Sequence, residues 1–272
     1  MKVLLINNTS AYHSGCIEVI NFYKDYFSNH NLDITNDFNV DVSGYDIVIA
    51  NGEGTMHHNA KKARSILNCL TKAKKSMLVN SVWQANDLSL AKMLLDIDYI
   101  SVRETKSRDE IYNQIGLNTN INLDLSYFQP VDIINKKSMN IVAGNKMRVP
   151  KTKPKRPKIT DVGEDGYIDI FTQSWQDIVS QLKVSKLLVT GRHHEMYAAC
   201  VAECPFVVIE GNTHKNQGLF ETANVNIPVL EFGCDNNTIK NAIKNIDTYK
   251  DEFTKLFTFM KSQKPPRFLD YV

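Results

Sequence analysis

The sequence lacks the features that would assign the chain to a membrane, fibrous or disordered class of protein. No stretch approaches the roughly 18 consecutive apolar residues of a transmembrane helix, and the apolar run at residues 1–6 is too short for a signal peptide. Heptad repeats and low-complexity tracts are also missing. The formal net charge of +2 is too small to indicate a nucleic-acid or membrane partner by itself. We therefore expect a soluble globular protein of the cytoplasm.

The five cysteines contain no C-x-x-C pair, and their number is odd. Scattered thiols of this kind favour a reducing compartment over a disulfide framework. Cys200 and Cys204 fall on one predicted helix, where a metal pair is one interpretation, but Ala198 and Val201 beside them favour burial in the core. The sequence therefore predicts no metal site.

Apolar runs alternate with amphipathic helical patterns along most of the chain, whose 272 residues suit two lobes better than one core. The runs lie at residues 3–6, 45–50, 76–80, 99–102, 139–143, 167–171, 186–190 and 206–210. Because parallel strands need long crossovers, this alternation predicts parallel sheets covered by helices. The pattern is interrupted at 129–138. The predicted fold is α/β, with two Rossmann-like lobes at 1–130 and 139–272 and a cleft between them, a GT-B-like arrangement.

Ligands of open parallel sheets bind beyond the carboxyl ends of the strands, so the segments that follow the strands are the first candidates for a site. One such segment is N-G-E-G-T at 51–55. Glu53 stands between two glycines, where a sharp turn can expose its carboxylate. The alternative is that Glu53 caps the next helix or pairs with Arg103. His13, in the loop after the first strand, is a further candidate.

The segment T-G-R-H-H-E-M at 190–196 follows an apolar run and opens a predicted helix. The N-terminus of a helix favours anions, and the planar guanidinium of Arg192 suits phosphate or carboxylate. His193 and His194 supply proton donors that titrate near neutral pH. Alternatively, Arg192 pairs with a nearby carboxylate and the histidines cap the helix. Lys215, in a polar segment after the last run, is predicted to contact a ligand or to be a solvated surface lysine.

Several of these segments resemble motifs of the polysaccharide pyruvyl transferase family, in the expected order, over roughly residues 3 to 220. The matching segments are Asn51-Gly52-Glu53-Gly54-Thr55, Ile100-Ser101-Val102-Arg103-Glu104 with Ser107, Asp124-Leu125-Ser126-Tyr127-Phe128, Arg192-x-His194, and His214-Lys215-Asn216-Gln217-Gly218. Two features depart from the family pattern. The first loop has N-G-E-G where the family has three glycines, and the chain is short.

The resemblance implies a GT-B-like enzyme that transfers a pyruvyl group from phosphoenolpyruvate to a sugar as a cyclic ketal. It implies that Arg192 and His194 bind the anionic donor through the C-terminal lobe, with Arg103 as a second clamp. Lys215, Gly52 and Gly54 complete the implied donor-binding set. For the chemistry we predict His194 as the acid and Glu53 as the base. Asn51, Thr55, His13 and His193 are further candidates, and the scheme requires neither a metal nor a bound cofactor.

Two other functions fit the same residues. Relatives assigned by sequence include glycosyltransferases, so a nucleotide-activated sugar is an alternative donor. A protein of another class, one that binds a glycan or a nucleotide without turnover, would keep the same scaffold. The sequence leaves these alternatives open.

Residues 146–158 form a basic segment that carries seven Lys or Arg and three Pro, so it cannot be a regular helix or strand. An acceptor glycan, a lipid-linked glycan or the surface of the inner membrane would attract it. A solvated loop without a function is the alternative. Nucleic acid is not expected as a partner, because no aromatic residues interleave with these charges.

Overall fold

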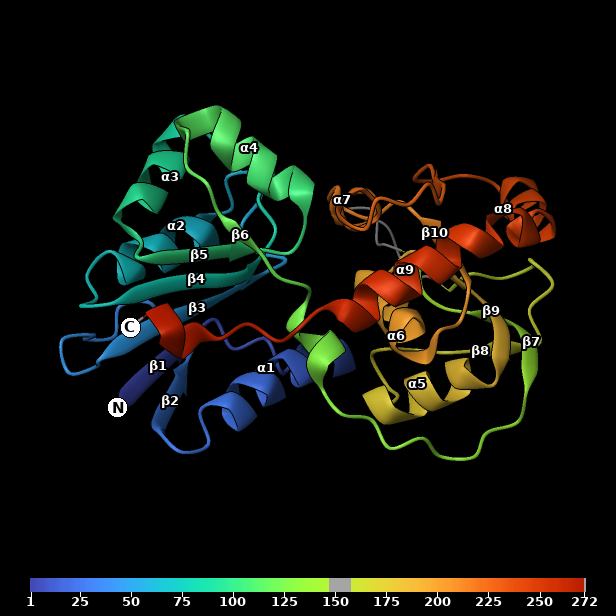
Figure 1. The fold of residues 1–272 in the computed structure, drawn as a ribbon, viewed down its shortest axis with the longest axis horizontal. Helices are drawn as coiled ribbons and strands as arrows, with labels where there is room; N and C mark the ends of the chain where they lie inside the picture. Colours follow the sequence, from blue (N-terminus) through green and yellow to red (C-terminus); the bar gives the residue numbers. More distant parts are fainter. Residues whose placement is uncertain (147–157, 272) are drawn as a thin grey trace. The chain divides into compact units, whose positions relative to one another are not determined.

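The computed structural model describes residues 1–146 and 158–271. Within these, the chain forms two compact units (Figure 1). The first unit consists of residues 1–11, 19–125 and 264–272, and the second of 12–18 and 126–263. Two short segments differ from the predicted division at 1–130 and 139–272. Residues 12–18 belong to the second unit, and residues 264–272 belong to the first. Most of the basic segment 146–158 lies outside the described residues.

The first unit is built on a six-stranded, wholly parallel sheet with the strand order β2-β1-β3-β4-β5-β6. The strands are β1 (Lys2–Ile6), β2 (Asn31–Thr35), β3 (Ile47–Glu53), β4 (Ser76–Ser81), β5 (Tyr99–Val102) and β6 (Asn120–Ile121). The helices are α1 (Ser14–Tyr26), α2 (Lys61–Leu70), α3 (Leu88–Lys92) and α4 (Thr105–Ile115), with short 3-10 turns η1 (Met93–Asp96) and η4 (Phe268–Tyr271). The first residues of α1, up to Glu18, belong to the second unit. In Figure 1, α1 lies on one face of this sheet and α2, α3 and α4 lie on the other.

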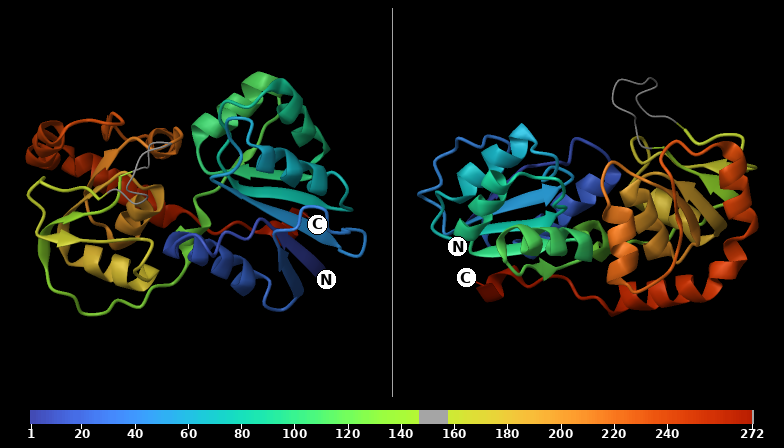
Figure 2. Two further views of the ribbon diagram at one scale, coloured as in Figure 1. Left: turned by 180° about the vertical axis from the view of Figure 1, so that it is seen from behind. Right: turned by 90° about the horizontal axis from the view of Figure 1, so that it is seen from above.

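The second unit is built on a five-stranded parallel sheet with the order β11-β10-β9-β7-β8. The strands are β7 (Met139–Ala143), β8 (Gly166–Tyr167), β9 (Ser185–Thr190), β10 (Phe206–Ile209) and β11 (Val229–Leu230). The helices are α5 (Trp175–Lys183), α6 (His193–Ala202), α7 (Lys215–Thr222), α8 (Asn236–Lys244) and α9 (Lys250–Ser262), with the 3-10 turns η2 (Leu125–Phe128) at the start of the unit and η3 (Ile246–Tyr249). Figure 2 shows helices packed against each sheet. The α/β fold with two Rossmann-like parallel sheets is confirmed.

Each sheet has one point at which the strand order reverses direction. In the first sheet it lies between β1 and β3, and in the second between β7 and β9. The loops that leave such a pair of strands diverge, so a crevice forms there, and this is where doubly wound sheets bind ligands. Residues 51–53 at the end of β3 and residues 190–192 after β9 both lie at the reversal point of their own sheet.

The helices differ from the predicted ones mainly at their first turns. Helix α6 begins at His193, within the segment 190–196 that was predicted to open a helix, and every residue of it except Val201 is buried. A helix that is apolar or buried on all sides has no amphipathic period to mark where it starts. Helix α7 begins at Lys215, where a polar loop was predicted. No helix of the described residues is both long and apolar enough to cross a bilayer.

The C-terminal segment packs on the first unit through aromatic side chains, and Tyr271 lies 4.2 Å from the ring of Tyr99 between centroids. Phe268 is fully buried and stacks on the rings of Tyr23 and Phe27, at centroid distances of 6.0 and 6.4 Å. Burying an aromatic side chain contributes about 1.5–3 kcal/mol, enough to hold a short terminal segment in place. No periodic pattern predicted these contacts, because they are made by isolated residues of a short segment.

Candidate functional site

The first turn of α6 is fixed by hydrogen bonds around Thr190. The Thr190 hydroxyl accepts from the backbone N–H of Arg192 at 2.9 Å and donates to the Glu195 carboxylate at 2.5 Å. The N–H of Gly191 donates to the carbonyl of Asn145 at 2.9 Å, which ties the loop after β9 to the end of β7. Arg192 is the N-cap residue of α6. Its side chain therefore starts from a backbone that has little freedom.

Arg192 is a buried cation with unused hydrogen-bonding capacity. Its side chain is only 9% exposed and stacks over the ring of Phe171, with 5.0 Å from Cζ to the centroid. Burial lowers the pKa of Arg192, and the charge of Glu195 partly opposes this shift. Among the described residues, Nε of Arg192 has no hydrogen-bond partner. A buried donor without a partner costs about 1–3 kcal/mol, more when it is charged, so the site favours an anion that accepts from it.

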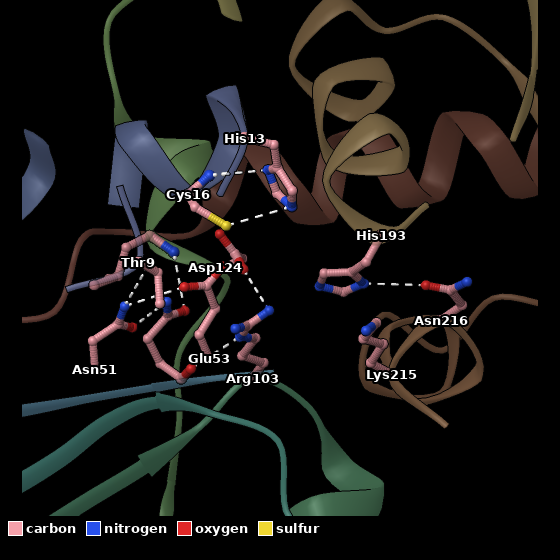
Figure 3. Close-up of polar contacts among 12 residues, drawn as sticks. Thr9, His13, Cys16, Asn51, Glu53, Arg103, Asp124, His193, Lys215 and Asn216 are labelled. Carbon is pink, nitrogen blue, oxygen red and sulfur yellow. Dashed lines mark hydrogen bonds and ion pairs between the residues drawn. The ribbon is translucent and has the colours of Figure 1, made fainter. Parts of the chain in front are cut away.

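A side-chain contact joins the first turns of α6 and α7. Nδ1 of His193 lies 3.1 Å from Oδ1 of Asn216 (Figure 3). Lys215, at the start of α7, is 9% exposed, and its ammonium donates to Oδ1 of Asn212 at 2.9 Å. The alternative of a solvated surface lysine is therefore wrong. Two helix N-termini that follow neighbouring strands, with Arg192 and Lys215 beside them, give this face of the second unit a positive potential.

His13 lies beside His194, as a residue of the segment 12–18 that belongs to the same unit. The two imidazole rings are 4.9 Å apart between centroids, and the ring of His13 lies 5.6 Å from that of Phe171. His194 itself is 7% exposed. The structure therefore brings together three of the predicted residues: Arg192, His194 and His13.

Gly15 leaves the space that His194 occupies. A Cβ atom at Gly15 would lie 2.6 Å from Cβ and Cγ of His194, so an alanine there must displace the imidazole. We expect Gly15→Ala to lower turnover by roughly tenfold to a hundredfold, because small misplacements of a reacting group have effects of this size. Steady-state kinetics check this. Gly44→Ala is the matched control, because nothing lies within 4 Å of a Cβ at Gly44, and equal turnover of the two variants would contradict the expectation.

Glu195 is a site residue that the sequence analysis missed. Its carboxylate is fully buried and accepts hydrogen bonds from the backbone N–H of Asn145 at 3.0 Å and from Thr190. Gly144 permits this approach, since a Cβ there would lie 2.1 Å from Oε2 of Glu195. Burial raises the pKa of Glu195 to about 7, while the hydrogen bonds and the charge of Arg192 oppose the shift. The only sequence signal was an acidic residue in the first turn of a helix, which most often is a simple cap.

This raised pKa predicts a pH dependence of stability. An acid whose pKa rises on folding, here from 4.5 to about 7, holds its proton more tightly in the folded chain. Its stabilising contribution is complete below pH 4.5 and is lost as the pH rises through about 7. We expect the free energy of unfolding to fall over this window by a few kcal/mol more in the wild type than in Glu195→Gln. Urea denaturation at a series of pH values measures this, and parallel curves would contradict it.

The polar residues at the carboxyl end of the first sheet form a second cluster. The amide of Asn51 donates to Thr9 at 3.1 Å and to the Glu53 carboxylate at 3.2 Å, and Asn80 donates to Oδ1 of Asn51 at 3.1 Å (Figure 3). Asn7, at the end of β1, donates to the carbonyl of Asn51. Glu53 has a positive φ of 34° and is 5% exposed. The structure thus joins Asn51 and Glu53 at the predicted strand end.

The other residues of this loop have plainer roles. A Cβ at Gly52 would lie 2.6 Å from Cβ of Ser81, so glycine there allows the end of β3 to approach β4. Gly54 is exposed, with nothing within 4 Å of a Cβ. The hydroxyl of Thr55 accepts from Asn7 at 3.4 Å. Neither glycine has a contact that identifies it as a donor-binding position.

Arg103 is held inside the first unit. It is 1% exposed, its guanidinium lies 2.6 Å from the Asp124 carboxylate, and its Nε donates to the carbonyl of Asn80 at 3.0 Å (Figure 3). Arg103 is thus paired with Asp124. Glu104 caps α4 by accepting from the N–H of Ser107. The S-V-R-E-x-x-S motif therefore has a structural explanation, and the role of Arg103 as a donor clamp stays a prediction.

Cys200 and Cys204 are buried, as predicted for core residues. Burial raises the pKa of both thiols, that of Cys204 to about 12. Neither thiol belongs to a group of potential metal ligands within the described ranges 1–146 and 158–271. The burial of both thiols agrees with their predicted place in the core.

Comparison with known proteins agrees with this architecture. A functionally uncharacterised protein from Klebsiella pneumoniae has 16% sequence identity and a TM-score of 0.62, with 86% of this chain and 93% of that chain covered. A putative UDP-N-acetylglucosamine 2-epimerase from Listeria monocytogenes has 10% identity and a TM-score of 0.57, with 94% and 90% covered. At these identities the likeness shows the fold alone. No curated protein matches the chain at a significant level.

The sequence model of one family, polysaccharide pyruvyl transferase, matches residues 3–213, which include every strand from β1 to β10 and the segments around Glu53 and Arg192. The resemblance found from the motifs is therefore confirmed, and the chain belongs to the polysaccharide pyruvyl transferase family.

Proposed function

We propose that this protein transfers a pyruvyl group from phosphoenolpyruvate to a sugar of a surface glycan or of its lipid-linked precursor, in the cytoplasm. The observation that carries the proposal is the buried guanidinium of Arg192, whose Nε has no partner within the described part of the chain. A donor with one phosphate and one carboxylate offers acceptors for this group, for Lys215 and for the N–H groups at the starts of α6 and α7. Family membership supports the same reaction.

In the proposed chemistry His194 protonates the methylene carbon of the enol. This gives an oxocarbenium-like centre, which a sugar hydroxyl attacks. Phosphate then leaves with the electron pair of its C–O bond, and a second hydroxyl of the sugar closes the cyclic ketal. Arg192 stabilises the negative charge of the leaving phosphate. Fixed cations in a buried site lower the free energy of such a transition state by several kcal/mol. A positioned acid of suitable pKa gives about 10²–10⁴-fold in rate.

Glu53 stays our predicted base for the acceptor hydroxyls. The Glu53 carboxylate is buried and accepts a hydrogen bond from the amide of Asn51, which orients it. The backbone of Glu53 has a positive φ, as residues in tight turns often do. Oriented side chains of this kind are what a general base requires, because geometry precedes pKa in proton transfer.

A thermal-shift comparison of phosphoenolpyruvate with a panel of nucleotide sugars tests the donor. Ligands that bind only the folded chain raise the melting temperature by mass action. We expect stabilisation by phosphoenolpyruvate that is reduced in Arg192→Ala, followed by release of inorganic phosphate when a suitable acceptor is added. The exposed Lys186, on β9, supplies the matched control Lys186→Ala. Stabilisation of the wild type by nucleotide sugars alone would overturn the proposal.

The second candidate is a glycosyltransferase that uses a nucleotide-activated sugar. Its support is the fold shared with the protein described as a putative UDP-N-acetylglucosamine 2-epimerase. This candidate predicts a nucleoside mono- or diphosphate product. A protein that only binds glycans or nucleotides would be stabilised by its ligand but would release neither product.

A further inference from the structure

Three side chains of the second unit form a cluster to which the proposed function gives no common role. The potential ligand atoms of His13, Cys16 and His194 all lie within 4.8 Å of one another. Cys16 and His194 are buried and His13 is half-buried. We propose that this cluster is a binding site for a divalent transition-metal ion of the zinc type.

The set of donor atoms determines the class of ion. One thiolate and two imidazoles suit Zn²⁺ and related first-row cations, whereas Mg²⁺ and Ca²⁺ require oxygen ligands. Sγ of Cys16 lies 3.4 Å from Nε2 of His13 (Figure 3). Tetrahedral zinc, with Zn–S of about 2.3 Å and Zn–N of about 2.1 Å, separates sulfur and nitrogen by about 3.6 Å. The pair is therefore already spaced as two ligands of one ion.

Short-range contacts hold the three residues in this arrangement. Ser14 docks on the loop after β8, because its N–H and its hydroxyl both donate to the carbonyl of Ile170, at 3.0 and 3.1 Å. Gly15 then packs directly against the ring of His194. Phe171 contacts the edge of the His13 ring, with 5.6 Å between centroids. A site held before the ion arrives loses little conformational entropy on binding.

The hydrogen bonds within the cluster predict an exchangeable ion rather than a permanent one. The backbone N–H of Cys16 donates to Nδ1 of His13 at 3.3 Å, so in this arrangement Nε2 carries the proton and faces Sγ. An ion bound at Nε2 moves that proton to the other nitrogen and releases the proton of the thiol, so binding weakens as the pH falls. Three protein ligands leave one coordination position open, as in zinc sites that exchange ligands.

A bound ion would also inhibit the proposed transfer. This consequence, unlike the binding itself, rests on the proposed function. The proposed proton transfer requires His194 as an imidazolium, a form that an imidazole cannot adopt while one of its nitrogens binds a metal ion. Occupancy of the cluster would therefore inhibit the proposed transfer, and a chelator would restore it. The binding itself does not depend on the identity of the reaction.

Titration of the purified full-length chain with Co²⁺ tests the site. Cobalt reports a thiolate ligand through a charge-transfer absorption in the near ultraviolet, and we expect saturation at one equivalent. Cys16→Ser should abolish the band, and His13→Gln should weaken binding at least about tenfold. Cys234→Ser is the matched control, because Cys234 is a half-buried cysteine of the same unit outside the cluster, and it should titrate as the wild type does.

Melting curves of each variant establish that it is folded. Absence of a thiolate band in the wild type, or an unchanged band in Cys16→Ser, would overturn the proposal. Thermal shifts with phosphoenolpyruvate, measured with a chelator present, report on the donor separately. A metal site that fails and a donor that fails are therefore distinguished by different measurements.

Discussion

Arg192→Ala is expected to reduce turnover by roughly a hundredfold or more while the melting temperature changes little. The reason is the unusual state of the guanidinium, which is buried, stacked on Phe171 and left with a donor that no described residue satisfies. Burial of this cation destabilises the folded chain, and Arg192→Ala removes the cation. The free energy of unfolding should therefore fall less than it would on loss of one partner of a buried ion pair. The fold loses little, whereas an anionic substrate loses its best donor.

Three variants separate this effect from a general disturbance of the second unit. Arg192→Lys keeps the charge but loses the planar fork, so it should recover only part of the activity. His194→Ala should be about as inactive as Arg192→Ala, because it removes the proposed acid. Lys186→Ala removes an exposed cation of β9 and should behave as the wild type. Wild-type turnover in both Arg192→Ala and His194→Ala would exclude the proposed site.

Sequence patterns predicted the parts of this fold that depend on local order. Strands β3 and β4 are buried along their whole length, and they appear in the sequence as continuous apolar runs, as expected for central parallel strands. Strand β2 was missed because its half-buried edge position gives it a mixed sequence, N-L-D-I-T. The residues that follow strands were predicted as site candidates for a topological reason that needs no contacts, and Arg192 lies at such a point.

What the sequence did not predict depends on contacts between distant residues. Glu195 becomes a group with a pKa near 7 because it is buried where Gly144, which follows β7, allows a close approach, although the hydrogen bond from the N–H of Asn145 lowers the pKa. Cys16 gains two histidine neighbours only because one of them, His194, comes from α6, far away in the sequence. Arg103 was assigned to a ligand because its partner Asp124 is not near it in the chain. Each case is a pairing that periodicity does not encode.

Asp124→Asn is expected to destabilise the first unit by about 3–5 kcal/mol, because it leaves the Arg103 guanidinium buried without a counter-charge. The ion pair has side chains only 2% and 0% exposed, so water cannot replace the lost partner. A loss of this size is a large fraction of the roughly 5–15 kcal/mol that holds a typical domain together. Urea denaturation of the full chain measures it.

Asp270→Asn is the matched control, the same chemical change in an ion pair with Arg267 whose side chains are 80% and 53% exposed, and it should cost less than about 1 kcal/mol. The double variant Arg103→Met with Asp124→Asn removes the unpaired charge and should recover part of the stability. This series also decides the role of Arg103. If Asp124→Asn is as stable as the wild type but binds phosphoenolpyruvate more weakly, Arg103 serves the donor; if stability falls and the double variant restores it, Arg103 serves the fold.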